Sequence, residues 1–245
     1  MARYSLHGGH NSIVQGANYG NWKEHIMDRQ VKDAVAAKLR ALGHTVYDDT
    51  DEVGTTQAQN LNNIVSKTNS HDVDLVVSFH LNSYDTKANG VEVLYYDQQA
   101  LSAKIAAQLS KDIGWLNRGA KERKDLYVLA NTKAPAILIE LGFIDNEADM
   151  AKWNPDKIAN SIVYALTGQS GGKTPPSKKN IIQSGAFSPY ETPDVMGALT
   201  SLKMTANFIL QSDGLTYFIS EPTSDAQLKG MTDYLDRKGW WYEVK

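Results

Sequence analysis

Two apolar segments decide the fold of this chain: Val76-Val77-Ser78-Phe79-His80-Leu81-Asn82 and Ala136-Ile137-Leu138-Ile139-Glu140-Leu141-Gly142-Phe143. Each apolar run is too short for an independent helix, so each is expected to form a buried strand. Each run also carries one ionisable residue, His80 or Glu140. Because buried ionisable groups need partners, the two strands are expected to deliver these side chains to one site, and a Zn²⁺ ion is a suitable partner.

Strands and helices alternate around these two segments. We expect strands at residues 3–6, 44–47, 74–80, 90–95, 126–129 and 136–140, and helices at residues 24–41, 57–68, 98–113 and 156–166. Such alternation predicts an α/β fold in which helices flank a mainly parallel sheet. Sheets of this kind carry their ligand sites at the carboxyl ends of the strands.

Composition narrows the chemistry that the chain can perform. The 245 residues include no cysteine, which excludes thiolate metal sites and cysteine nucleophiles, so a zinc site must use His, Asp or Glu. A formal net charge of −3 gives no general attraction to nucleic acid. No run approaches the roughly 20 apolar residues of a membrane span, so we expect no membrane insertion.

A linker at residues 168–179, rich in glycine, proline, serine and lysine, divides the chain. We expect one domain at residues 1–167 and a second at residues 180–245. The order strand, helix, strand occurs twice in the second domain, which predicts a small α+β module of two βαβ-like repeats. The start of the chain lacks the apolar core of a secretory signal, so we expect synthesis in a cytoplasm and release by another route.

Four residues are the candidates for catalysis. His10 follows a glycine-rich loop, Glu24 begins the first long helix, and His80 and Glu140 end neighbouring strands. We expect His10, Glu24 and His80 to bind Zn²⁺ with one position left open, and Glu140 to act as general base for the attacking water.

The first domain resembles the zinc-dependent N-acetylmuramoyl-L-alanine amidases of the Amidase_3 family, in the branch found in phage endolysins. The matching stretches follow the family order and comprise residues 9–12, 16–17, Glu24, 78–82, 90–96, 117–121, 125–129 and 139–146. The resemblance implies that His10, Glu24 and His80 bind zinc and that Glu140 is catalytic. It also implies cleavage of the amide between N-acetylmuramic acid and the first L-alanine of the peptidoglycan stem.

One departure from this resemblance leaves an alternative open. Many relatives begin with an aspartate-proline-glycine-histidine loop, whereas this chain has Ser5-Leu6-His7-Gly8-Gly9-His10. The spacing to Gly16 and Ala17 favours His10 as the ligand, and His7 is the alternative. His25 directly follows Glu24, but adjacent helical residues point about 100 degrees apart, so only one of the two can face the metal.

The second domain resembles the C-terminal cell-wall-binding domains of Bacillus phage lysins. The matching residues are 184–187, 216–218, 222–224 and 238–244. The resemblance implies binding to a bacterial cell-wall polymer. The aromatic residues Tyr190, Tyr217, Phe218, Trp240, Trp241 and Tyr242 are candidates for stacking on sugar rings, although a module of this size also needs aromatic residues for its core.

Together these features predict a peptidoglycan hydrolase that a phage or prophage uses as an endolysin for host lysis, acting on the wall after holin-type release. Two alternatives stay open at this point. One is a host sporulation or autolytic amidase. The other is a non-catalytic protein that only binds peptidoglycan.

Overall fold

The computed structural model describes residues 1–169, 180–221 and 223–245, without the side chains of Asp225 and Ala226. The chain divides into two compact units, Met1–Thr174 and Pro175–Lys245, which are described separately below. Residues 170–179 of the expected linker lie outside the described residues. No helix in the described ranges is long and apolar enough to cross a membrane.

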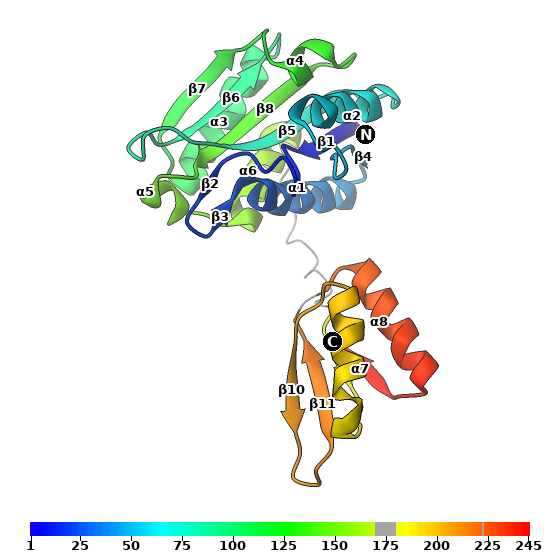
Figure 1. The fold of residues 1–245 in the computed structure, drawn as a ribbon. Coiled ribbons are helices and arrows are strands. Elements are labelled where there is room, and N and C mark those ends of the chain that lie inside the picture. The colour runs from blue at the N-terminus through cyan, green and yellow to red at the C-terminus, as the bar shows by residue number, and fades with distance from the viewer. Residues whose placement is uncertain (170–179, 222) are drawn as a thin grey trace. The chain divides into compact units, whose positions relative to one another are not determined.

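A six-stranded sheet forms the centre of the first unit (Figure 1), with the strand order β4-β1-β5-β8-β6-β7. The strands are β1 (Arg3–Gly8), β4 (Thr45–Asp48), β5 (Leu75–Asn82), β6 (Val91–Tyr95), β7 (Asn117–Glu122) and β8 (Ala136–Phe143). The pairs β1–β4, β1–β5, β5–β8 and β6–β7 are parallel, and only β6 runs antiparallel to its neighbour β8. The prediction of a mainly parallel sheet is confirmed.

Helices cover both faces of this sheet. They are α1 (Glu24–Ala41), α2 (Gln57–Asn69), α3 (Gln99–Ile113), α4 (Tyr127–Asn131), α5 (Glu147–Met150) and α6 (Pro155–Thr167). The apolar sides of α1, α3 and α6 pack on one face, and α2 and α4 lie over the other (Figure 1). A short hairpin of β2 (Asn18–Tyr19) and β3 (Trp22–Lys23) leads into α1.

The sequence of α1 explains its position. Val31, Val35 and Leu39 recur at helical spacing and are fully buried against the sheet. The helix ends before Gly43, whose φ of +84° is a left-handed conformation that glycine adopts at little cost. The helix starts at Glu24, where the chain returns from the hairpin of β2 and β3 to the carboxyl end of the sheet.

One expected strand of the first unit is wrong, and one observed strand was not expected. The strand expected at residues 126–129 is wrong, because these residues enter helix α4, which buries Val128 and Leu129 and leaves Tyr127 exposed. Four successive apolar residues fit a strand and a short helix equally well. The strand β7 at Asn117–Glu122 was not expected, since it lies at the edge of the sheet and has no buried residue.

The second unit is a four-stranded antiparallel sheet with two helices. Its elements are β9 (Ile182–Ser184), the 3₁₀ helix η1 (Pro189–Glu191), α7 (Thr192–Ser201), β10 (Ala206–Leu210), β11 (Thr216–Ser220), α8 (Asp225–Lys238) and β12 (Tyr242–Val244). The strand order β10-β11-β9-β12 places one strand between the two strands of each βαβ repeat. The expected repeats are therefore present as split βαβ units, the ferredoxin-like arrangement. The core includes Ile182, Val195, Phe218, Met231 and Leu235.

The strand register of the first unit fixes which side chains meet. His7 lies opposite Ser78, Ser78 lies opposite Leu138, and His80 lies opposite Glu140. Because side chains alternate between the two faces of a sheet, all five share the face that α2 and α4 cover. The polar residues of both fold-deciding segments thus lie together near the carboxyl ends of β5 and β8.

Candidate metal centre

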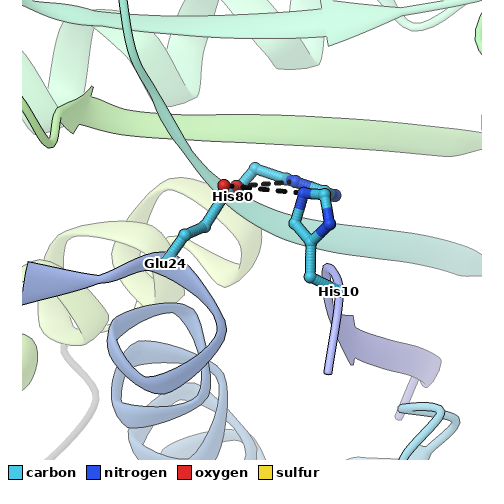
Figure 2. Close-up of side chains that lie close together, drawn as sticks. All are labelled: His10, Glu24 and His80. Atoms are coloured by element: carbon cyan, nitrogen blue, oxygen red, sulfur yellow. Dashed lines mark hydrogen bonds and ion pairs between the residues drawn. The ribbon is translucent and has the colours of Figure 1, made fainter. Parts of the chain in front are cut away.

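The structure brings together three of the four candidate residues as a possible metal-binding group. His10 comes from the loop after β1, Glu24 from the first turn of α1, and His80 from β5 (Figure 2). One ligand atom from each residue lies within 4.8 Å of the other two. Glu24 Oε1 lies 3.0 Å from His80 Nδ1, and Glu24 Oε2 lies 3.5 Å from His10 Nε2.

Backbone groups hold the Glu24 carboxylate in place. The N–H of Ala17 donates to Oε2 over 2.7 Å, and the N–H of Leu81 donates to Oε1 over 3.1 Å. Burial favours a higher pKa for Glu24, but the hydrogen bond from His80, the charges of His80 and His10, and the Ala17 N–H together lower the pKa of this carboxyl. Glu24 is therefore ionised and oriented before any ion arrives.

The two histidines differ in their protonation. Burial and the nearby charge of His80 lower the pKa of His10, so this imidazole is neutral near pH 7. For His80, burial acts in the same direction, but the hydrogen bond and charge of Glu24 outweigh it and raise the pKa to about 9. Only a neutral imidazole can bind a metal ion, so His80 must lose a proton when an ion binds.

Zinc loading at pH 7.5 is expected to release about one proton for each ion bound. The proton comes from His80, whose pKa is about 9 in the metal-free protein, while Glu24 and His10 already have their metal-binding forms. Zinc affinity should therefore fall about tenfold for each pH unit below 9 and level off above it. Titration calorimetry in buffers of different ionisation enthalpy measures this proton, and a buffer-independent heat would contradict the assignment.

Two glycines leave room for the side chains of the three-residue group. A Cβ atom at Gly9 would overlap the His80 ring, and one at Gly16 would overlap the His10 ring and the Glu24 carboxylate. His10 itself has a φ of +59°, an uncommon backbone conformation for a residue other than glycine. Two imidazoles and one carboxylate converging on one point are the donor set of catalytic zinc sites, so these residues fit a Zn²⁺ ion.

Replacing Gly9 with alanine is expected to displace His80 and weaken zinc binding by about 10- to 100-fold, the range for residues that orient a metal ligand. The added methyl group meets the imidazole ring rather than the hydrophobic core, so the fold should persist. Gly197→Ala is the matched control, because a Cβ at that helical position has no atom within 4 Å. Competition with a fluorescent chelator measures the affinity; equal values for the two variants would argue against this role of Gly9.

Arg29 fixes the loop that carries His10. Its guanidinium donates to the carbonyl oxygens of Gly9 over 3.0 Å and His10 over 2.9 Å, and to that of His25 over 2.7 Å. The sequence gives no signal for this role, since an arginine in the second turn of a helix is common on protein surfaces. Arg29 therefore belongs to the site as a positioning residue that sequence patterns do not identify.

Glu140 lies beside the three-residue group but is not part of it. Its Oε2 atom is buried and accepts no hydrogen bond from any residue that the structure describes. Burial raises the pKa of Glu140 to about 7; Glu24 and Glu92 act in the same direction and the charge of His80 opposes them. A carboxyl group with this pKa can both accept and donate a proton near neutral pH.

The alternative ligands lie outside the group. His7 is on β1, fully buried, and faces the pocket next to the site, while His25 is buried at the start of α1. Asn82 and Asn146, which also lie in the matching stretches, have internal partners. The Asn82 amide donates to Glu92, and the Asn146 side chain caps α5.

Two protein-family models match this chain. The model of the N-acetylmuramoyl-L-alanine amidase family, Amidase_3, matches residues 6–168, and the model of the PlyG cell wall binding domain matches residues 201–244. The uncharacterised protein YqiI of Bacillus subtilis (strain 168) is 32% identical over 169 residues, which cover 64% of this chain and 80% of that protein.

A solved structure of an endolysin catalytic domain resembles the first unit. The catalytic domain of the CD27L endolysin targeting Clostridia difficile superposes with a TM-score of 0.63 at 27% identity, covering 69% of this chain and 99% of that domain. The solution structure of the PlyG cell wall binding domain is 90% identical over 29% of this chain and 82% of that domain, with a TM-score of 0.28. The family model spans most of the chain, and this protein belongs to the N-acetylmuramoyl-L-alanine amidase family, Amidase_3.

Proposed function

We propose that this protein is a zinc-dependent endolysin that cleaves the amide between N-acetylmuramic acid and the L-alanine of the peptidoglycan stem. Residues 1–167 form its catalytic domain, residues 168–179 a linker and residues 180–245 its wall-binding domain. The observation that carries the proposal is the group of His10, Glu24 and His80, with Glu140 beside it on the neighbouring strand. Membership of the amidase family supports the same reaction.

The residues of the site have two separate roles, metal binding and proton transfer. His10, Glu24 and His80 would hold a Zn²⁺ ion, which when bound supplies Lewis acidity toward the scissile carbonyl and a water molecule. Glu140 accepts a proton from the attacking water and then donates it to the leaving nitrogen of alanine. The raised pKa of Glu140, about 7, suits a group that must carry the proton in both directions.

The second unit would hold the enzyme on the wall. Its match to the PlyG cell wall binding domain supports this role. Tyr190 and Trp241 are 95% and 64% exposed, whereas Phe218 is buried and Trp240 packs against the same core. Of the six aromatic candidates, Tyr190 and Trp241 are thus the best placed to stack on a sugar of the wall polymer. The enzyme would reach the wall from the host cytoplasm after holin-type release.

Digestion of purified cell walls with and without a chelator tests the proposed reaction. The expected products are stems with a free alanine amine and glycan strands that have lost the stem, identified by mass, and the chelator should suppress both. New ends at a peptide crosslink or at a sugar bond would overturn the amidase assignment. Binding to walls without any new amine would support the alternative of a non-catalytic wall-binding protein.

A further inference from the structure

A pocket of about 230 Å³ extends from the metal centre between the sheet, α2 and α4. His10, His80 and Glu140 line the end at the reaction centre. Apolar side chains line the walls, and they include Leu61, Ile64, Leu94, Val128 and Leu138. The mechanism proposed above uses none of these wall residues.

Two buried polar side chains of this pocket that the mechanism does not use have no hydrogen-bond partner among the described residues. Both ring nitrogens of His7 and the Oγ atom of Ser78 are buried and make no hydrogen bond with any part of the chain that the structure describes. Both residues are 0% exposed, and they lie opposite each other on β1 and β5. Ser5, two residues earlier on the same face of β1, is equally buried but bonds to Asp49 and Thr68.

Glu140 Oε2 is another buried atom of this pocket without a partner in the described part of the chain, but the proposed mechanism uses it, and two other polar side chains of the pocket have partners. The Asn60 amide donates to Asp51 and to the His10 carbonyl, and the Arg123 guanidinium pairs with Asp125 at the exposed rim. Buried polar groups are satisfied in almost all native proteins, so His7 and Ser78 are candidates for contact with a ligand. The unpaired hydrogen-bonding groups of His7 and Ser78 therefore lie together at the buried side of the pocket.

The donors and acceptors of His7 and Ser78 indicate which chemical group of a ligand they would bind. Burial lowers the pKa of His7 to about 3, so its imidazole is neutral and offers one N–H donor and one acceptor nitrogen. The Ser78 hydroxyl also donates and accepts. A carboxamide, which has both an N–H₂ group and a carbonyl oxygen, satisfies such a pair. A carboxylate only accepts hydrogen bonds and brings a charge that neither residue neutralises.

The shape of the pocket indicates which part of the substrate enters it. A glycan strand continues in both directions from each muramic acid, so it needs an open groove rather than a small pocket with a buried end. The stem peptide can place a single substituent there. We propose that His7 and Ser78 form a specificity subsite that binds the α-carboxamide of the second residue of the stem peptide while the scissile amide lies at the metal centre; this inference rests on the proposed amidase function.

Two matched soluble substrates test the subsite: N-acetylmuramoyl-L-alanyl-D-isoglutamine and the same compound with the free α-carboxylate. The wild-type enzyme is expected to cleave the carboxamide with a kcat/KM at least about tenfold higher, because unpaired buried groups reject the wrong analogue. His7→Leu and Ser78→Ala should each bring this ratio close to one. The ratio compares two substrates on one enzyme, so a general loss of stability does not change it.

Ser102→Ala is the matched control, because Ser102 is also fully buried and its hydroxyl has no partner among the described residues, but it lies on α3, outside the pocket. This control should keep the wild-type ratio. A wild-type enzyme without preference for the carboxamide, or an unchanged ratio in Ser78→Ala, would overturn the proposal even if His7→Leu does not fold. Failure of the wild-type enzyme to release alanine amines from walls would instead refute the amidase function itself.

Discussion

The variant Glu140→Gln is expected to hydrolyse cell walls about 10²- to 10⁴-fold more slowly than the wild type, the range for loss of a general base. Glutamine keeps the size of the side chain but cannot accept the proton of the attacking water. Because Glu140 lies outside the three-residue group, the variant should bind zinc with wild-type stoichiometry. Release of free amines from purified walls gives the rate, and elemental analysis gives the metal content.

Glu122→Gln is the matched control for this experiment. Glu122 is an exposed carboxylate on β7 that pairs with Lys124 at the surface, so the same change there should leave the rate near that of the wild type. A Glu140→Gln enzyme with near wild-type rates and bound zinc would show that another group moves the proton. A Glu140→Gln protein without zinc would instead make Glu140 a metal ligand.

Removal of a ligand is expected to abolish activity by a different route. In His80→Ala, the group keeps only His10 and Glu24, so zinc affinity should fall by more than about 100-fold, the upper end for residues that merely orient a ligand. Hydrolysis should then drop to the level of the chelator-treated enzyme. Equilibrium dialysis against buffered zinc measures the loss of metal, and excess zinc should restore part of the activity.

Three other histidine variants sharpen this test. His10→Ala should behave like His80→Ala, whereas His7→Leu should retain its zinc, because His7 lies outside the group. His71→Ala is the control, since His71 stacks on Tyr47, contacts Asp49 and lies outside the group. If His7→Leu lost zinc and His10→Ala kept it, the ligand assignment within the Ser5–His10 segment would have to be reversed.

The elements that sequence patterns predict well are those with a long or strongly apolar signal. Helix α1 has Val31, Val35 and Leu39 buried at helical spacing and a glycine after its last turn, and the apolar runs of β5 and β8 are longer than the run that forms α4. The edge strand β7 has the polar sequence NRGAKE, so its pairing with β6 comes from the sheet rather than from its own side chains. The short helix α4 has too few residues for a helical period to appear.

In the candidate site, too, sequence patterns predict some features and not others. Strand ends and the helix start predict that His10, Glu24, His80 and Glu140 converge, because parallel strands deliver their carboxyl ends to one edge. Sequence patterns predict a strand only at residues 3–6, so they do not place the His7 side chain. In the structure β1 extends to Gly8, and the alternation of side chains along it turns His7 to the same face as Ser5. The hydrogen bonds of Arg29 join residues from two elements, so they appear only once the chain has folded.

The pairing of β9 with β12 has a practical consequence for protein engineering. Val244 lies opposite Ile182, and the backbones of Ile181 and Lys245 exchange two hydrogen bonds, so the two ends of the described part of this unit, residues 180–245, lie side by side. Units whose termini are adjacent tolerate circular permutation and insertion into host loops. This module could therefore be grafted as a cassette at either end, or within a surface loop, of an unrelated reporter protein.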